Sequence, residues 1–335
     1  MIDSSKFAFA DARVRTLEGK LLNKNKIDRI INADKNEEAL RVLAESGYKN
    51  NQGQSSDNPY YYEEILNKEL KDLNKLMSDI CPIKEAIYIF KSEYDYFNIK
   101  VLMKAKYLNK DLSYLLMDAG NIELDKLVKY FNDEQFSMLS SYMSNAIKRI
   151  LEESNSKIDP QMIDIYLDNA LYEEMFDVVS KADNKFLTNL VKVLIDTINI
   201  KTFSRIKSQG KQRDFLEKAI IKNGSIRPEI YLRSNQDSIE NFPERITFTG
   251  YSLKVKEGIE SYLKLNNFIL LEKNLDNIII KYIRDNRFVG LGIEPVIGYY
   301  FSKKNEIKVV RTILVGKFNN ISPEKIYERL GDMYV

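Results

Sequence analysis

The sequence predicts an all-α protein, and three observations lead to this fold class. Only 13 glycines and seven prolines, 20 of 335 residues, interrupt the chain, which is about half of their usual share. The apolar residues recur with the period of a helix. Three short patterns also return in the same order along the chain, which is typical of a protein built from repeated helical units.

The composition excludes most kinds of catalytic site. Histidine and tryptophan are absent and Cys81 is the single cysteine, which rules out His-containing metal sites, Cys₄ zinc sites, disulfides and nucleophiles paired with histidine. Cys81 is therefore expected to be buried or incidental. The glycines near 290–292 and at Gly316 lack the further residues of a dinucleotide loop or a P-loop. We expect no catalytic residue, no metal and no cofactor.

Charge and hydropathy predict where the chain acts. The net charge is +2, from 51 basic and 49 acidic residues, so no basic field attracts nucleic acid. No secretory signal pattern follows Met1, and apolar runs such as 268–271 are far shorter than the roughly 20 residues of a membrane span. The expectation is a cytoplasmic chain that reaches a membrane only through partner proteins.

The repeats predict three related units of about 100 residues. An apolar residue followed by Asn or Glu, Ile and Lys ends at Lys100, Lys201 and Lys308, and the first two copies carry Asp95 and Asp196 three positions before the Asn. A second pattern precedes it at 66–70, 167–171 and 275–279. A third pattern follows at 120–125, 224–229 and 319–324. The predicted units are residues 1–119, 120–223 and 224–335.

Each predicted unit is made of amphipathic helices. The third pattern predicts a helix start in every unit, because Pro228 and Pro323 suit the first helical position and Ser322 suits the N-cap. Asp159 and Pro160 predict another helix start. Residues 245–255 alternate partly like a strand, but their place in the unit corresponds to the helical stretch 140–150, so we predict helix. Polar residues predict loops at 50–59 and 154–160. The apolar faces are Ile65, Leu66, Leu70, Leu73, Leu76 and Met77 in the first unit, and Ile163, Tyr166, Leu167, Ala170, Leu171 and Phe176 in the second.

The two ends of the chain complement each other. Residues 7–15 are similar to the Asn-Ile-Lys helix of the other units with nothing before it, and residues 321–330 are similar to an opening helix with nothing after it. If the C-terminal helix closes onto the N-terminal helix, three units form a ring or funnel instead of an open solenoid.

The chain resembles the C subunit of the prokaryotic V/A-type rotary ATPases, a family that includes the d subunit of the eukaryotic V-ATPase. Both ends carry the resemblance, and the repeats support it between them. The N-terminal residues are Phe7-Ala-Phe9-Ala-Asp11-Ala12-Arg13-Val14-Arg15-Thr-Leu17-Glu18, Leu21-Leu22, Glu38-Ala39-Leu40 and Leu43-Ala44-Glu45-Ser-Gly47-Tyr48. The C-terminal residues are Pro295-Val-Ile-Gly298-Tyr299-Tyr300-Phe-Ser-Lys-Lys304-Asn-Glu306-Ile307-Lys308, Arg311, Ile313-Leu314, Gly316-Lys317 and Pro323-Glu-Lys-Ile326. Asp11 departs from the family pattern, where we expect Asn.

The resemblance implies a funnel-shaped protein of three similar helical domains around a pseudo-threefold axis. It implies a non-catalytic central-rotor subunit, one copy per complex, on the cytoplasmic face of the membrane. Its partners would be the central-stalk subunits of the soluble ATPase head and the membrane rotor ring. The protein would couple hydrogen ion or sodium ion transport to ATP synthesis or hydrolysis.

Several surface residues are candidates for partner contact, each with a structural alternative. The short helices of the third pattern recur on one edge of each unit and are expected either to face partners or to pack internally. Arg13, Arg15 and the three repeat lysines either line a polar cavity or cap helices and pair with carboxylates such as Asp95 and Asp196. Tyr60-Tyr61-Tyr62 and Tyr299-Tyr300 are interface aromatics or half-buried core residues. The adjacent glutamates at 63–64, 152–153 and 173–174 point about 100° apart and are expected on solvated faces. The candidate partner-binding residues are Ile122, Asp125, Ile226, Glu229, Ile321, Glu324, Arg13 and Arg15.

Two other functions remain open at this stage. A helical-repeat adaptor for an unrelated assembly fits the repeats equally well but does not explain the end motifs. An enzyme that uses carboxylates and lysine is the third hypothesis, and the absence of histidine counts against it.

Overall fold

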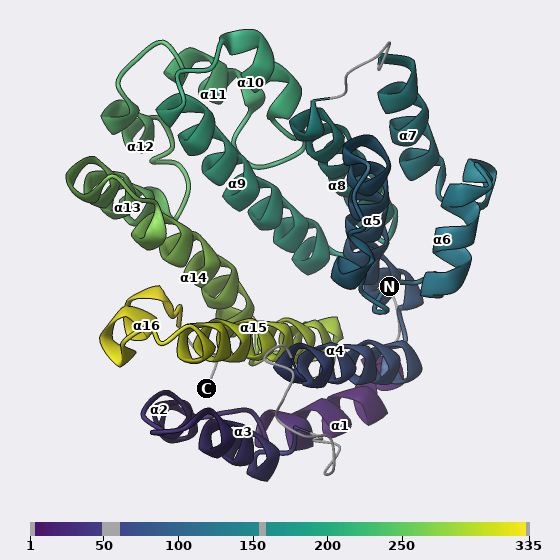
Figure 1. Ribbon diagram of the computed structural model, residues 1–335, viewed down its shortest axis with the longest axis vertical. Helices are drawn as coiled ribbons and strands as arrows, with labels where there is room; N and C mark the ends of the chain where they lie inside the picture. Colours follow the sequence, from purple (N-terminus) through teal and green to yellow (C-terminus); the bar gives the residue numbers. More distant parts are fainter. Residues whose placement is uncertain (1–3, 49–60, 154–158, 333–335) are drawn as a thin grey trace. The chain divides into compact units, whose positions relative to one another are not determined.

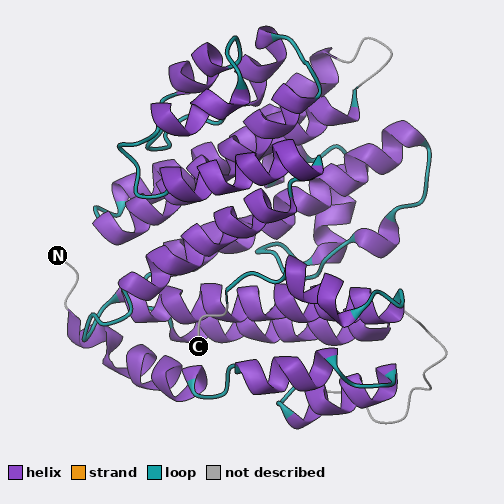
Figure 2. Cartoon of the chain, turned by 90° about the vertical axis from the view of Figure 1, so that its left-hand side faces the viewer, coloured by secondary structure: helices purple, strands orange, loops and turns teal. Residues whose placement is uncertain are grey.

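The protein is helical throughout the part of the chain that the structure describes. The computed structural model describes residues 4–48, 61–153 and 159–332, and these ranges contain 16 α-helices, four short 3₁₀ helices and no strand (Figures 1 and 2). The predicted all-α class is therefore confirmed. The predicted loop at 50–59 lies outside the described residues, as does most of the one at 154–160.

The contacts divide the chain into two compact units. Unit 1 consists of Met1–Lys84 and Ser261–Val335, and unit 2 of Glu85–Glu260. Both ends of the chain therefore belong to unit 1.

Unit 1 is built around one long helix, α15 (Ile293–Phe318), which contacts all the other helices that lie wholly in this unit. Sixteen of its 26 residues are buried, so the helix is apolar on nearly every side, as a central helix must be. Arg311 pairs with Glu63 on α4, and the ring of Phe318 lies 5.0 Å from that of Tyr62. The helices around α15 are α1 (Ala8–Glu18), α2 (Lys24–Ile31), α3 (Asn36–Glu45), α4 (Tyr61–Ile80), α14 (Ile269–Asp285) and α16 (Pro323–Arg329).

Unit 2 is built from long antiparallel helices with shorter ones between them. Lys100 and Lys104 on α5 pair with Asp168 and Asp164 on α8. The helices are α5 (Lys84–Leu108), α6 (Leu124–Asn132), α7 (Ser141–Glu153), α8 (Pro160–Lys181), α9 (Lys185–Ser208), α10 (Arg213–Ala219), α11 (Pro228–Ser234), α12 (Phe242–Arg245) and α13 (Ser252–Leu265), the last of which ends in unit 1. The 3₁₀ helices are Ser4–Phe7 in unit 1 and Ser113–Leu115, Phe136–Met138 and Ile239–Asn241 in unit 2.

The predicted helices lie where the patterns placed them, with one exception. The predicted apolar faces are buried on α4 and α8 except at Leu76 and Phe176, which are half-buried. Asp159 caps α8, with Pro160 in the first turn, as predicted. The exception is the stretch 245–255. It is not a strand, but helix covers only its two ends, because residues 246–251 form turns between α12 and α13.

Candidate functional site

Two side chains on α5 hold the segment that leads into α6. The side-chain amide of Asn98 donates to the Met117 carbonyl (2.8 Å) and its oxygen accepts from the Met117 N–H (2.9 Å). One turn earlier, the buried carboxylate of Asp95 accepts the N–H groups of Asn121 (2.8 Å) and Ile122 (3.2 Å). We call this pair, Asp95 with Asn98, the Asp95 clamp.

The same hydrogen bonds recur between α9 and the segment that leads into α11. Asn199 exchanges two hydrogen bonds with the backbone of Ile221, of 2.7 and 2.9 Å. The carboxylate of Asp196 accepts the N–H groups of Ser225 (3.1 Å) and Ile226 (3.0 Å). We call Asp196 with Asn199 the Asp196 clamp. It has one further donor, since the hydroxyl of Tyr251 also donates to Asp196.

A glycine allows each carboxylate to approach the backbone. A Cβ atom at Gly120 would collide with the carboxylate of Asp95, and one at Gly224 would collide with that of Asp196. The glycines that open two copies of the third pattern are therefore needed for close approach. Neither has a positive φ.

Burial controls the charge of both carboxyl groups. It raises the pKa of Asp95 to about 6, although the two backbone donors and Lys91 act in the opposite direction. Burial also raises the pKa of Asp196, and the Tyr251 hydroxyl is the strongest of the groups that oppose this.

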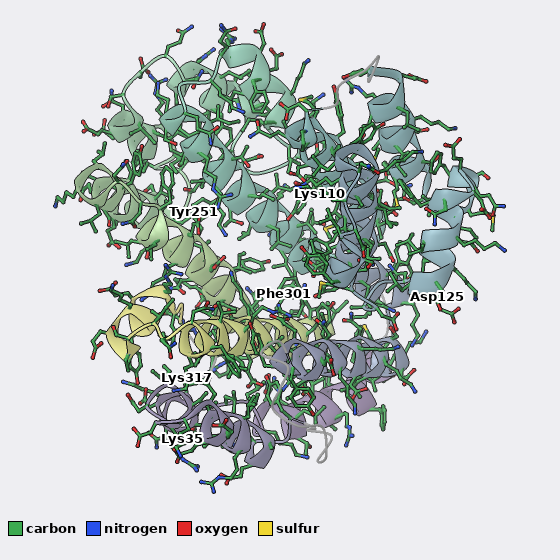
Figure 3. The ribbon with its side chains drawn as sticks, viewed as in Figure 1. Lys35, Lys110, Asp125, Tyr251, Phe301 and Lys317 are labelled. Atoms are coloured by element: carbon green, nitrogen blue, oxygen red, sulfur yellow. The ribbon has the colours of Figure 1, made fainter. Side chains whose placement is uncertain are left out.

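The predicted partner-binding residues on α6, α11 and α16 fall into two groups. The carboxylates of Asp125, Glu229 and Glu324 are exposed in the first turns of their helices (Figure 3 labels Asp125). Ile122 and Ile321 are half-buried. The side chain of Ile226 is fully buried, so it reaches no partner in this conformation, and its backbone N–H belongs to the Asp196 clamp.

In unit 1 a backbone hydrogen bond holds the segment that leads into α16. The Ile321 N–H donates to the Gly316 carbonyl, and Gly316 leaves room for Ile326. Lys317 donates to the carbonyls of Ile31 (3.1 Å) and Ala33 (2.6 Å), at the C-terminal end of α2. Ser322 lies at the predicted N-cap position of α16 but its side chain makes no capping hydrogen bond.

The last helix also contacts the N-terminal region of the chain. The Tyr327 hydroxyl donates to Asp28 on α2 (2.8 Å) and accepts from Asn32 (3.3 Å). The C-terminal helix α16 thus contacts α2, in the N-terminal segment of the same unit.

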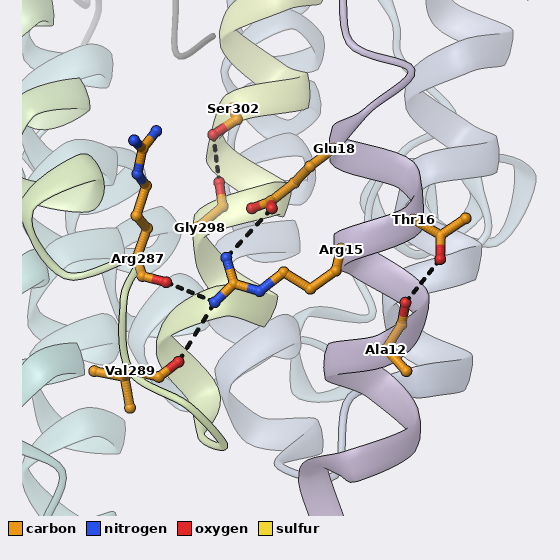
Figure 4. A network of polar contacts seen from close by, with 8 residues as sticks. All are labelled: Ala12, Arg15, Thr16, Glu18, Arg287, Val289, Gly298 and Ser302. Atoms are coloured by element: carbon orange, nitrogen blue, oxygen red, sulfur yellow. Dashed lines mark hydrogen bonds and ion pairs between the residues drawn. The ribbon is translucent and has the colours of Figure 1, made fainter.

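Arg15 and Asp11 on α1 hold the loop before α15. The Arg15 guanidinium donates to the carbonyls of Arg287 (2.7 Å) and Val289 (3.4 Å) and pairs with Glu18 (Figure 4). Asp11 accepts the Gly292 N–H at 3.1 Å, while its other oxygen has no hydrogen-bond partner in the described structure. Burial raises the pKa of Asp11. Arg15 thus pairs with a nearby carboxylate, as its structural alternative predicts, and Arg13 is exposed.

A buried glutamate, Glu306, lies at the position that Asn98 and Asn199 occupy in the other two copies of the sequence pattern. Glu306 accepts from the Leu22 N–H, the Tyr48 hydroxyl (2.8 Å) and Lys303 (2.6 Å). Lys303 occupies the place of Asp95 and Asp196 and also pairs with Glu69 at 2.9 Å. In unit 1 this charged cluster therefore holds the segment that leads into α2.

Several sequence interpretations need correction or are confirmed by these contacts. Pairing is confirmed for Lys100 and Lys308, but their partners are Asp168 and Asp276, since Asp95 and Asp196 bind backbone.

The solvated-face prediction is wrong for Glu174. This residue is buried and accepts hydrogen bonds from Tyr88, Tyr96 and Ser140. The neighbour of an exposed helical residue points about 100° away from it, which here is toward the core. The core interpretation is confirmed for Cys81, Tyr62, Tyr299 and Tyr300, which are buried, whereas Tyr60 lies outside the described residues.

Sequence reasoning located the clamp residues but missed their role. The Asp-x-x-Asn spacing was visible in two units, and it places both side chains on one helix face. The signal that indicates their partners is the glycine of the third pattern, which follows 25 residues after Asp95 and 28 after Asp196.

Comparison with known proteins shows the family. The profile of the family described as ATP synthase (C/AC39) subunit matches residues 10–329. The chain belongs to this family. It is 27% identical to the C subunit of the A-type ATP synthase of Methanocaldococcus jannaschii, over 97% of this chain and 86% of that one. It is 23% identical to the C subunit of the V-type sodium ATPase of Enterococcus hirae, over 96% and 97%. The protein is thus a C subunit of the V/A-type ATPases.

Neither a metal-ligating cluster nor a membrane-spanning helix is found among the described residues. Among the described residues, no three side chains of the metal-ligating kinds come together. Within the same residues, none of the helices has the length and apolar character needed to cross a membrane.

Proposed function

We propose that this chain is the non-catalytic central-rotor subunit of a V/A-type ATPase. It couples the central-stalk subunits of the ATPase head to the membrane rotor ring, so that ion transport is linked to ATP synthesis or hydrolysis. The observation that carries this proposal is the family match over residues 10–329, nearly the whole chain. The protein would lie on the cytoplasmic face of the membrane through its partners, one copy per complex.

The proposal includes the architecture that the repeats predict. Residues 1–119, 120–223 and 224–335 would form three similar helical domains in a funnel around a pseudo-threefold axis. The equivalent hydrogen bonds of the two clamps support the repeat, because corresponding residues make them at the end of the first predicted unit and at the end of the second.

The proposed partner-facing surface consists of the first turns of α6, α11 and α16. Each carries an exposed carboxylate, namely Asp125, Glu229 or Glu324. A polar surface of this kind suits contact with a ring of different symmetry, because polar contacts adapt to several relative positions of the two parts. One deep apolar pocket would fit only one of those positions. Exposed charges act mainly on the rate of association and on specificity.

The test is rebinding to complexes that lack this chain. Membranes from a deletion strain, with ring and stalk subunits retained, are incubated with purified protein, and bound chain and ATP-driven ion transport are measured. Wild-type protein should bind and restore coupling, while showing no ATPase activity alone. Binding to neither ring nor stalk subunits, or turnover by the isolated chain, would contradict the proposal.

A charge-matched pair of triple variants tests the surface. Alanine at Asp125, Glu229 and Glu324 should slow rebinding about tenfold or more, an effect that salt reduces. The control carries alanine at Glu37, Glu85 and Asp214, which are also exposed carboxylates in first turns of helices. Equal rebinding of the two variants would remove α6, α11 and α16 as the contact surface.

A further inference from the structure

The clamp carboxylates act on the backbone directly in front of two proposed partner-facing helices. Ile122, which donates to Asp95, lies two residues before the start of α6, and Ile226, which donates to Asp196, lies two residues before the start of α11. Two successive N–H groups aimed at one carboxylate fix both the position and the direction of the chain at that point. A change at the carboxylate is therefore transmitted to the first turn of the helix.

We propose that Asp95 and Asp196 are positioning residues, which fix the first turns of α6 and α11 for contact with the partner subunits. This inference rests on the proposed function, since it takes α6 and α11 as partner-facing helices. Neither carboxylate touches a partner itself, because both are buried.

The held segment makes further contacts with α5. The side chain of Asn121 donates to the Tyr88 carbonyl (2.9 Å) and to the Ser92 hydroxyl (3.1 Å). These bonds hold the same residue whose backbone N–H donates to Asp95.

The Asp196 clamp has one further contact in the same unit. Tyr251 donates its hydroxyl to Asp196 beside the two backbone N–H groups of Ser225 and Ile226.

Amide hydrogen exchange on the full isolated chain tests the hold itself. The Asn121, Ile122, Ser225 and Ile226 amides should exchange far more slowly than their intrinsic rates, because each donates to a buried carboxylate. Exchange of these amides at their intrinsic rates would overturn the hold. This measurement needs no variant, so it does not depend on a mutant that folds.

Two variants separate the carboxylates. Asp95→Asn offers one acceptor oxygen to two donors, so it should reduce protection of Asn121 and Ile122 and leave Ser225 and Ile226 unchanged. Asp196→Asn should do the reverse. Gly120→Ala displaces the Asp95 carboxylate while keeping its charge, and Gly290→Ala, which meets nothing within 4 Å, is its control. Unchanged protection in Asp95→Asn and Gly120→Ala would overturn the positioning role.

Rebinding to the deletion-strain membranes tests the consequence for assembly. At pH 7 both Asn variants should bind ring and stalk subunits at least about tenfold more weakly than wild type, with unfolding still cooperative. If wild-type protein binds and both Asn variants bind equally well, this inference is overturned but the proposed function is not. Failure of wild-type protein to bind overturns the proposed function, while hydrogen exchange still reports on the clamps.

Discussion

The Asp95 and Asp196 clamps have the same geometry but different electrostatics. Each carboxylate accepts two successive backbone N–H groups beside a glycine, and each asparagine exchanges two hydrogen bonds with one residue. Only Asp196 also receives a tyrosine hydroxyl. At Asp196 a donor from outside the repeat thus opposes the effect of burial on the carboxyl pKa.

The corresponding position of unit 1 extends this comparison. There Lys303 and Glu306 replace the Asp and the Asn, and the buried glutamate accepts from a backbone N–H, a tyrosine and the lysine. The function of holding an incoming segment is kept, but a charged cluster performs it. The positions of Asp95, Asp196 and Glu306 differ in how much charge they bury. We therefore expect substitutions at these positions to lower the free energy of unfolding by different amounts.

The largest effect is expected for Glu306→Ala in unit 1. It removes the acceptor of the Leu22 N–H and the Tyr48 hydroxyl and leaves Lys303 with Glu69 alone. Breaking a buried ion pair in this way costs about 3–5 kcal/mol. Urea unfolding measures the loss, and Asp285→Ala, which removes an exposed pair with Lys281, is the control with an expected cost below about 1 kcal/mol. Similar costs for both variants would show that the cluster adds no stability.

A pH-dependent effect of intermediate size is expected for Asp95. Its pKa rises from 3.8 to about 6 on folding, so the native state binds the proton more tightly and stability falls as the pH rises from about 4 to about 6. The change corresponds to about 3 kcal/mol in total. It appears as the difference in unfolding free energy between wild type and Asp95→Asn, followed across this pH range. A difference that stays constant with pH would mean that Asp95 titrates alike in both states.

The helices could be predicted from the sequence, but the clamp partners could not. The period of apolar residues and the Asp159-Pro160 pair depend on neighbours along the chain, which the sequence displays. The Met117 and Ile221 backbone groups and the Tyr251 hydroxyl lie 19 to 55 residues from their partners, so only the folded chain brings them together. The same reason explains Glu174, whose three hydroxyl partners come from distant segments. The turns at 246–251 departed from the helix expected by analogy with 140–150, because the units are similar without being identical there.

The smallest effect is expected for Tyr251→Phe, which should make the two clamps alike. The variant removes the Tyr251 donor from Asp196, so the pKa of Asp196 should rise further. Loss of a hydrogen bond to a charged group costs about 1.5–3 kcal/mol, and less here because Phe buries no unpaired hydroxyl, so we expect about 1–2 kcal/mol at pH 7. Once the pH is low enough to protonate Asp196 in both proteins, the cost should shrink. Tyr262→Phe, which keeps the ring stacked 4.1 Å from Phe268, is the matched control. Carboxyl carbon NMR follows Asp196 directly, and an unchanged titration in Tyr251→Phe would mean that the tyrosine does not cause the difference between the clamps.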